Sequence, residues 1–331
     1  MSRTLAGLPI QEDDAERLAN ALRHEDAQTR SRARWAVIRL GDVASGRLPE
    51  LLPGAKYRGL REELLDEIAL SRLGQAWRGW WRVLGSFDSH KGDEAARARV
   101  IQALGRYLNW DNPTPERIEG VLGALSKGKA LIEAAMQWRD PSAGAAPGEP
   151  PSPTDKIRGA QWRLVMAYGG FETLIKTVLG LGAKDRPPDR GHFEQLVARS
   201  PLPPHPPLAA PPRGLKSVDR WCDAGANGHA ETGTTAGAEG ELESHPLIEF
   251  LTMTNGDVKI FRRWFLQGES VSNWVDALFL ARAIRNATAH GALSASKAAE
   301  LKLGEAIAVL TRDLTLVAAA IFEVLAAGPA D

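Results

Sequence analysis

The sequence predicts an all-α protein, built from an N-terminal helical domain and a C-terminal antiparallel helix bundle with an irregular insertion. Apolar residues return every three or four positions through most of the chain, as on the buried face of a helix. Ala, Leu, Arg and Glu, which favour helices, dominate the first 140 residues. The chain lacks the alternation of apolar and polar residues that is typical of β-strands.

The composition is that of a globular protein with balanced charge. The chain has 331 residues, of which 44% are hydrophobic and 25% charged, and its length suggests two domains. Its 41 basic residues are matched by 41 acidic residues. This balance argues against broad binding along a phosphate backbone, which needs clustered Lys and Arg, and favours a small local site.

Cysteine content and hydropathy bear on the cellular compartment. The single cysteine, Cys222, excludes an intrachain disulfide and the paired-cysteine spacing of zinc sites. The first ten residues lack the apolar core of a signal peptide, and no stretch approaches the roughly 18 apolar residues of a membrane span. We therefore expect a cytoplasmic protein with no membrane partner.

The N-terminal helical domain is predicted over residues 1–140. Its helices are expected at 13–23, 27–40, 60–73, 76–84, 93–108, 115–125 and 127–138. Pro53, Pro113 and Pro115 lie between these segments, where a helix edge tolerates proline. Residues 141–154 are rich in Pro, Gly, Ala and Ser and are predicted to form a linker.

The C-terminal domain is predicted over residues 155–331. Its first helix has an apolar stripe that reaches Val178 and is expected to end at Gly180. Residues 183–245 contain a proline-rich run and then Gly- and Thr-rich sequence, which predicts a loop-rich insertion. Two helices follow, at 271–290 and 296–325, and the four–three apolar spacing of the last one suits an antiparallel bundle.

A short motif at the end of the penultimate predicted helix combines Arg285, Asn286 and His290. Gly291 follows directly and is a typical helix-terminating residue. On a helical wheel the three side chains fall at roughly 0°, 100° and 140°, so they can face one pocket. Looser Arg-to-His pairs elsewhere in the chain lie in or beside proline-rich sequence, or lack the polar residue after Arg.

This motif resembles the signature of HEPN ribonucleases. The resemblance covers residues 155–327, including a long first helix, a variable middle, the motif helix and a long closing helix. It implies an endoribonuclease that needs neither metal nor cofactor and whose RNA substrate attacks its own phosphodiester through the 2′-hydroxyl. The products would be 2′,3′-cyclic phosphate and 5′-hydroxyl ends. It also implies a homodimer through the motif face, and a toxin or antiviral defence role with a regulatory partner protein.

The resemblance assigns a role to each motif residue. His290 would transfer protons, and Arg285 would stabilise charge on the phosphorus with its guanidinium group. Asn286 would orient His290 or a phosphate oxygen. Three further residues are candidates for the binding site: Glu172, Lys176 and Arg282. Glu172 and Lys176 are four residues apart on the first helix, so an ordinary surface salt bridge is the simpler interpretation of that pair.

A second interpretation of the motif is structural. Arg and His side chains near the end of a helix can stabilise its terminal carbonyls and its dipole without catalysis. The domain would then be a non-catalytic helical adaptor that binds RNA, a nucleotide or a partner protein such as an antitoxin.

The N-terminal domain contains one conspicuous segment, Trp77–Arg82, in which aromatic and basic residues interleave as on some base-stacking surfaces. Trp77 and Trp81 share a helix face with Leu73 and Leu84, so packing in the core is the favoured interpretation.

Overall fold

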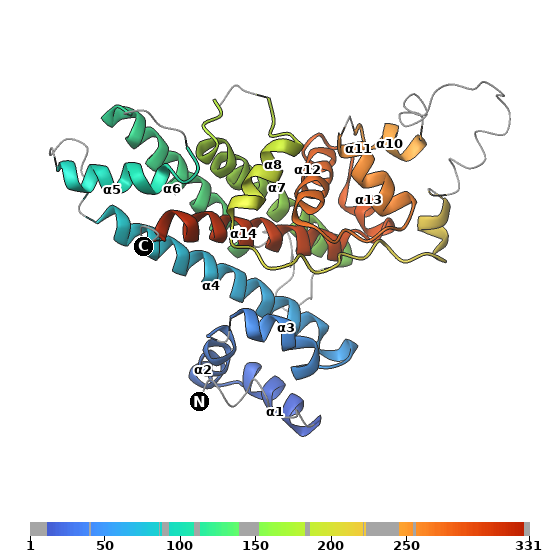
Figure 1. Cartoon of the computed structure of the whole chain (residues 1–331). Helices are drawn as coiled ribbons and strands as arrows, with labels where there is room; N and C mark the ends of the chain where they lie inside the picture. The colour runs from blue at the N-terminus through green and yellow to red at the C-terminus, as the bar shows by residue number, and fades with distance from the viewer. Residues whose placement is uncertain are drawn as a thin grey trace, which may run out of the picture.

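A computed structural model describes residues 12–39, 41–85, 87, 93–108, 113–138, 152–182, 186–220, 222, 245–253 and 256–327. Over these residues the secondary structure is helical, apart from one antiparallel bridge between Leu208 and Val271, and the all-α prediction is confirmed (Figure 1). The helices, in chain order, are α1 (Glu12–Leu22), α2 (Ala27–Ile38), α3 (Asp42–Leu51), η1 (Ala55–Tyr57), α4 (Arg58–Leu84), α5 (Glu94–Leu104), α6 (Pro115–Gln137), α7 (Pro153–Val178), α8 (Arg190–Arg199), α10 (Pro246–Phe250), α11 (Gly256–Phe261), η3 (Arg262–Leu266), α12 (Trp274–Ala289), α13 (Ala295–Glu300) and α14 (Gly304–Ala326).

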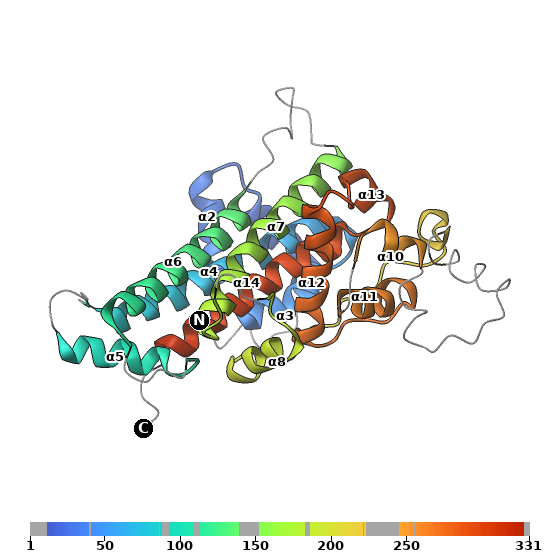
Figure 2. The same ribbon diagram turned by 90° about the horizontal axis from the view of Figure 1, so that it is seen from above.

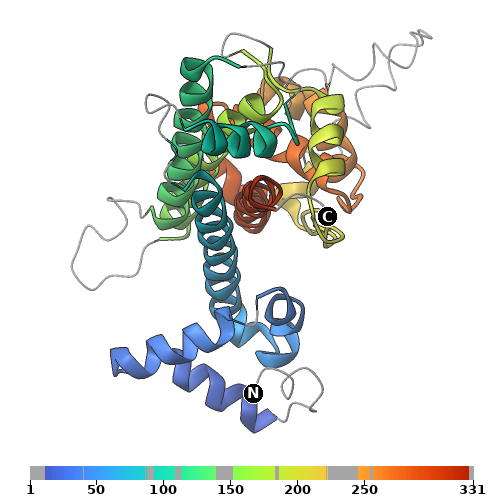
Figure 3. The same ribbon diagram turned by 60° about the vertical axis from the view of Figure 1, so that its left-hand side comes forward.

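Four long helices, α4, α6, α7 and α14, form the body of the molecule. Seen from above, α6 lies beside α7, and α14 passes between α7 and α4 (Figure 2). Figure 3 shows α14 almost along its axis, with other helices on several sides. Most of its residues are buried whichever way they point, because nearly the whole circumference of α14 contacts protein.

The long helices differ from the sequence prediction in two ways. α4 and α6 each run without interruption where two shorter helices were expected. The interior residue Gly74 does not break α4, because a helical glycine costs only about 1 kcal/mol and packing on α14 offsets that cost. The last predicted helix, 296–325, is divided into α13 and α14 at Lys302, whose φ is +57°. The shorter helices α3 and α8 were not predicted.

The direction of the last helix follows from its contacts with α4. Arg312 of α14 donates to Glu62 of α4 at 2.5 Å, and Arg72 of α4 donates to Glu323 of α14 at 2.7 Å. Residue numbers rise together along this contact, so α4 and α14 run parallel. The antiparallel bundle was predicted within residues 155–331, which do not include α4. The chain between them returns to the starting end of the bundle before α14 begins. α6 and α7 do form an antiparallel pair (Figure 2).

Buried side chains form two clusters that do not coincide with the predicted domains. The smaller cluster extends from Ala15 to Ile68, in α1 to α3 and the first half of α4. The larger one extends from Leu73 to Leu325 and includes residues on both sides of the predicted linker. Helix α4 takes part in both clusters (Figure 3). Most of the linker lies outside the described residues, and α7 begins within it, at Pro153, capped by Ser152.

The predicted loop-rich insertion, residues 183–245, is ordered where the structure describes it. Residues 190–199 form α8, and the proline-rich run that follows packs as an extended strap over residues 200–212. Trp274 Nε1 donates to the carbonyl of Pro203 at 2.6 Å, and His205 is buried. The prediction of irregular structure is therefore wrong for α8. Residues 223–244 lie outside the described part of the chain.

The tryptophan segment of α4 is only partly in the core. Trp80, which the helical wheel had placed off the core face, is fully buried, whereas Trp81 is 54% exposed. Trp77 is half-buried and meets Phe322 of α14 edge-on, with ring centroids 5.0 Å apart. The prediction that Trp81 packs in the core is wrong, because α14 approaches this part of α4 at Trp77 and Gly79.

No helix in the described residues is both long enough and apolar enough to cross a lipid bilayer.

Helices α6 and α7 approach closely where two glycines meet. A Cβ atom added at Gly170 would lie 2.5 Å from the carbonyl oxygen of Gly128, and one added at Gly128 would lie 2.8 Å from that of Gly170. Such distances are shorter than van der Waals contact allows, so neither position accommodates a side chain without moving a helix.

We expect Gly170→Ala to lower the free energy of unfolding by about 1–3 kcal/mol, because the new methyl group forces α6 and α7 apart. Gly123→Ala, also in α6, is the matched control, since a Cβ there meets nothing within 4 Å. That variant should be more stable by about 0.5–1 kcal/mol through helix propensity alone. Urea unfolding curves measure both changes, and equal shifts for the two variants would contradict the close crossing.

Candidate functional site

The candidate site lies on α12, whose two ends are fixed by local chemistry. The Asn273 side chain accepts a hydrogen bond from the Asp276 backbone N–H at 2.8 Å and so caps the helix. The helix therefore starts three residues later than predicted, since Val271 is taken up by the bridge to Leu208. At the other end Gly291 has φ of +78°, the left-handed conformation that glycine adopts readily after a helix.

Arg285 is half-buried and held by its neighbours. Its guanidinium carbon lies 5.4 Å from the ring centroid of Tyr168 on α7, a cation–π contact. One Nη donates to the side-chain oxygen of Asn286 at 2.9 Å. The buried Nε of Arg285 has no acceptor within the described residues. The guanidinium is thus positioned by an aromatic ring and keeps a donor that no described residue uses.

Asn286 and Arg282 converge on a buried carboxylate, Asp257 of α11. Arg282 Nε donates to one oxygen of Asp257 at 2.7 Å, and Asn286 Nδ2 donates to the other at 3.2 Å. Arg282 also donates to the carbonyl of Pro188 at 2.6 Å. Both ends of the Asn286 amide are therefore engaged, with Arg285 and with Asp257. In this structure the Asn286 side chain orients Arg285, and Asn286 meets His290 only through its backbone carbonyl, which accepts from the His290 N–H at 3.0 Å.

Burial sets the electrostatics of this cluster. Desolvation raises the pKa of the Asp257 carboxyl above its ordinary value, although Arg282 and Asn286 both act to lower it. Burial likewise raises the pKa of the Tyr168 hydroxyl well above its usual range. Asp257 and Tyr168 are both buried and contact the arginines, so their role is to position them.

His290 is the exposed member of the motif. It lies at the C-cap of α12 with its side chain in solvent, and its imidazole makes no hydrogen bond with the part of the chain that the structure describes. The helix end that carries it is tied to α7, because Gln161 donates to Thr288 at 3.3 Å and to the carbonyl of Leu293 at 2.8 Å. His290 is thus an available proton carrier on a fixed support.

Glu172 and Lys176 form the expected i,i+4 ion pair, 3.2 Å apart, on α7. They line a cavity of about 580 Å³ between α6 and α7. Glu172 and Arg285 both act electrostatically on the Tyr168 hydroxyl, in opposite directions. The pair therefore lies near the arginine, but it belongs to a neighbouring groove and takes no part in the Asp257 cluster.

Sequence reasoning missed the two residues that hold the motif together. Tyr168 fits the apolar stripe of α7 and is indistinguishable from any other core residue by spacing. Asp257 precedes an apolar run in a short helix that the periodicity does not detect. An acidic residue beside a buried apolar run was the available signal, since a buried carboxylate needs a cationic partner.

No family model, curated protein or solved structure matches the chain. Within the described residues, no group of three or more His, Cys, Asp or Glu side chains is placed to hold a metal ion. The chemistry of the site therefore has to be argued from its own residues. A guanidinium held over a ring can bind an anion, and an exposed imidazole at the end of the same helix can transfer a proton.

Replacing the buried carboxylate by a neutral amide, Asp257→Asn, should change how stability depends on pH. A raised pKa means that folded Asp257 keeps its proton where the unfolded chain has lost it. This contribution to stability is present below the ordinary value of 3.8 and is lost as the pH rises through the folded pKa. The difference in unfolding free energy, wild type minus variant, should therefore fall as the pH rises from 3.8. Urea unfolding across this pH range measures it.

Asp276→Asn is the matched control and should behave in the opposite way. Burial acts to raise the pKa of Asp276, but hydrogen bonds from Asn273, Arg190 and Arg263 hold it below 3.8. Its contribution to stability is present above 3.8 and is lost as the pH falls through the folded pKa. Parallel pH profiles for the two variants would contradict the proposed environment of Asp257.

Proposed function

We propose that this chain is a metal-independent endoribonuclease whose reaction takes place at the C-terminal end of α12. The observation that carries the proposal is the placement of an exposed, uncommitted His290 one turn beyond Arg285, which Tyr168 and Asn286 hold in position. A proton carrier and a fixed guanidinium on one helix end are the groups that phosphodiester cleavage without metal needs.

The proposed reaction is an internal transfer. The RNA 2′-oxygen attacks the adjacent phosphorus, the bond from phosphorus to the 5′-oxygen breaks, and a 2′,3′-cyclic phosphate forms. His290 transfers the proton that the 2′-hydroxyl loses or that the 5′-oxygen gains. Arg285 stabilises the charge on the phosphorane oxygens with its guanidinium group. DNA is inert because it lacks the nucleophile.

The proposal includes a homodimer through the motif face. One copy of the face supplies one Arg285 and one His290, whereas the reaction needs both a base and an acid. Two copies facing each other across a two-fold axis would supply both groups. A cytoplasmic location gives access to RNA, and restraint by a partner protein would suit a toxin or antiviral defence role.

A second candidate function is a non-catalytic adaptor that binds RNA, a nucleotide or a partner protein such as an antitoxin. The commitment of Asn286 and Arg282 to Asp257 favours it, because these two motif-side residues are used within the fold. The exposed His290 imidazole favours the enzyme.

His290→Ala and Arg285→Ala should each lower the rate of RNA cleavage by about 10²-fold to 10⁴-fold, since each removes a group from the transition state. Total RNA, tRNA and a matched DNA are incubated with the full chain in EDTA, and the cut ends are analysed for 2′,3′-cyclic phosphate. His192→Ala is the control, because His192 belongs to a looser Arg-to-His pair on α8 and should leave the rate unchanged.

Thermal unfolding is followed beside the assay, because Arg285 contributes to packing on Tyr168. Equal cleavage by wild type and both variants would point to a contaminating nuclease and favour the adaptor. Cleavage that appears only with added Mg²⁺ would rule out the side-chain mechanism.

Mixing wild type with an excess of His290→Ala tests the dimer. A mixed dimer holds both copies of Arg285 but only one of the two His290 side chains that supply the base and the acid. We expect the excess variant to lower activity below that of the same amount of wild type alone. Unchanged activity, despite subunit exchange shown by tagged co-purification, would contradict a shared site.

A further inference from the structure

Charge is segregated along α4. Its first half, residues 58–70, carries four carboxylates, at Glu62, Glu63, Asp66 and Glu67, and two arginines, Arg58 and Arg61. Its second half, residues 71–84, carries three arginines and no acidic residue. The charged side chains of the two halves therefore need partners of opposite sign.

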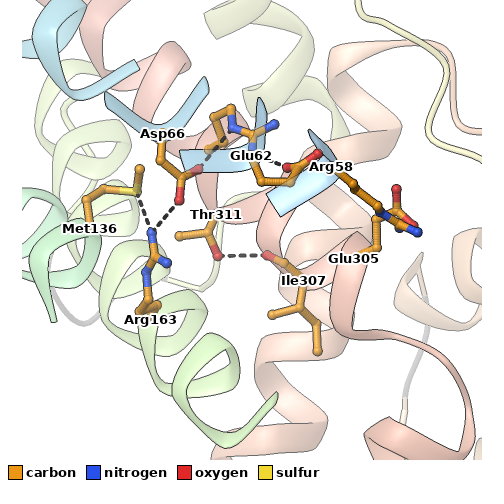
Figure 4. Close-up of polar contacts among 9 residues, drawn as sticks. Arg58, Glu62, Asp66, Met136, Arg163, Glu305, Ile307 and Thr311 are labelled. Atoms are coloured by element: carbon orange, nitrogen blue, oxygen red, sulfur yellow. Dashed lines mark hydrogen bonds and ion pairs between the residues drawn. The ribbon is translucent and has the colours of Figure 1, made fainter. Parts of the chain in front are cut away.

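The four carboxylates of the first half all form ion pairs within the molecule. Arg312 of α14 donates to Asp66 at 3.0 Å and to Glu62 at 2.5 Å, and Arg163 of α7 donates to Asp66 at 2.9 Å (Figure 4). Arg34 of α2 pairs with the other two carboxylates of this half. These carboxylates hold α2, α7 and α14 against α4.

Of the three arginines in the second half, one forms an ion pair with a carboxylate of the described residues. Arg72 is used by Glu323 of α14, at 2.7 Å. Arg78 and Arg82 are exposed, and no carboxylate of the described residues pairs with either. Two cations therefore remain on the surface beside an exposed tryptophan, Trp81.

Trp81 is supported from beneath. Its ring meets Trp77 edge-on, with centroids 5.8 Å apart, and Trp77 is itself packed on Phe322 of α14. Lys129 of α6 lies over the Trp77 ring at 5.4 Å. A tryptophan held in this way loses little side-chain entropy on binding, so its exposed face can stack on a planar group at low entropic cost.

Arg78, Trp81 and Arg82 share one side of α4. At 100° per residue they lie at roughly 60°, 0° and 100°, and Gly74 and Gln75 extend the same side by about 10 Å toward the middle of the helix. In the first half of α4 this side is covered by α2, through Arg34. In the second half Arg78, Trp81 and Arg82 are exposed.

We propose that this surface, formed by Arg78, Trp81 and Arg82, binds a single strand of RNA, with a base stacked on Trp81 and phosphates on the two arginines. An aromatic ring between cations that lack carboxylate partners is the combination that single-stranded nucleic acids use. The neighbours Gly74 and Gln75 add no charge, so the two arginines set the charge of this surface and favour an anionic partner. The inference rests on RNA being the substrate, and it gives the N-terminal half of the chain a role in holding it.

Binding is measured in the His290→Ala background, so that RNA is not cut, by fluorescence anisotropy with a short labelled single-stranded RNA. Trp81→Ala should weaken binding about 5-fold to 100-fold, the loss expected for one stacked base. Trp81→Phe should restore most of it. Changing Arg78 and Arg82 together to Gln should reduce the slope of log affinity against log salt by about 1.4, because each single-strand phosphate contact contributes about 0.7.

Trp35→Ala on α2 is the matched control, since Trp35 is 58% exposed and belongs to another helix. It should bind RNA like the parent. Unchanged binding by Trp81→Ala, equal weakening by Trp35→Ala, or no binding of single-stranded RNA by the parent would each overturn the proposal. Binding that depends on Trp81, in a chain that never cleaves RNA, would contradict the ribonuclease proposal alone and support the RNA surface.

Discussion

Two buried charged residues in the middle of α14, Arg312 and Asp313, form the constraint on which the rest of the fold depends. α14 is buried on nearly all sides, yet it carries Arg312 and Asp313 in its middle. Arg312 reaches the acidic half of α4, and Asp313 lies 3.1 Å from the buried His205 of the strap. Breaking a buried charged pair leaves an uncompensated charge and typically costs about 3–5 kcal/mol. Helix α4 and the strap of residues 200–212 are therefore fixed in register along α14, in addition to their apolar packing.

The strap also connects α14 to the helix that carries the candidate site. His205 also meets the ring of Trp274, with centroids 4.8 Å apart, and Trp274 is the first residue of α12. The other end of α12 is tied to α7 by Gln161. Because both ends are held, Arg285 and His290 are presented from a helix that cannot easily rotate, and small displacements at a catalytic site have large effects on rate.

Periodicity predicted the helical class, the apolar stripe of α7 and the end of α12 at Gly291, because these depend on local spacing and glycine conformation. It could not predict that α14 runs parallel to α4, since an apolar stripe carries no direction. It chose Trp81 for the core in place of Trp80, because a wheel shows which residues share a face but not where the next helix lies.

The site shows the same limit. The arrangement of Arg285 and Asn286 could be read from sequence as a polar sector, but not their engagement by Tyr168 and Asp257, which come from distant parts of the chain. A local motif names side chains with suitable chemistry. Tertiary contacts then decide which of them remain available, and in this structure they leave His290 in solvent.

We propose that RNA meets the exposed end of α12. This contact is tested by nuclear magnetic resonance of the isotope-labelled chain, titrated with an RNA carrying 2′-O-methyl groups that prevent cleavage. We expect the ring signals of His290 and the Nε–H signal of Arg285 to shift in proportion to the bound fraction. Saturable RNA binding that leaves both residues unperturbed would contradict it.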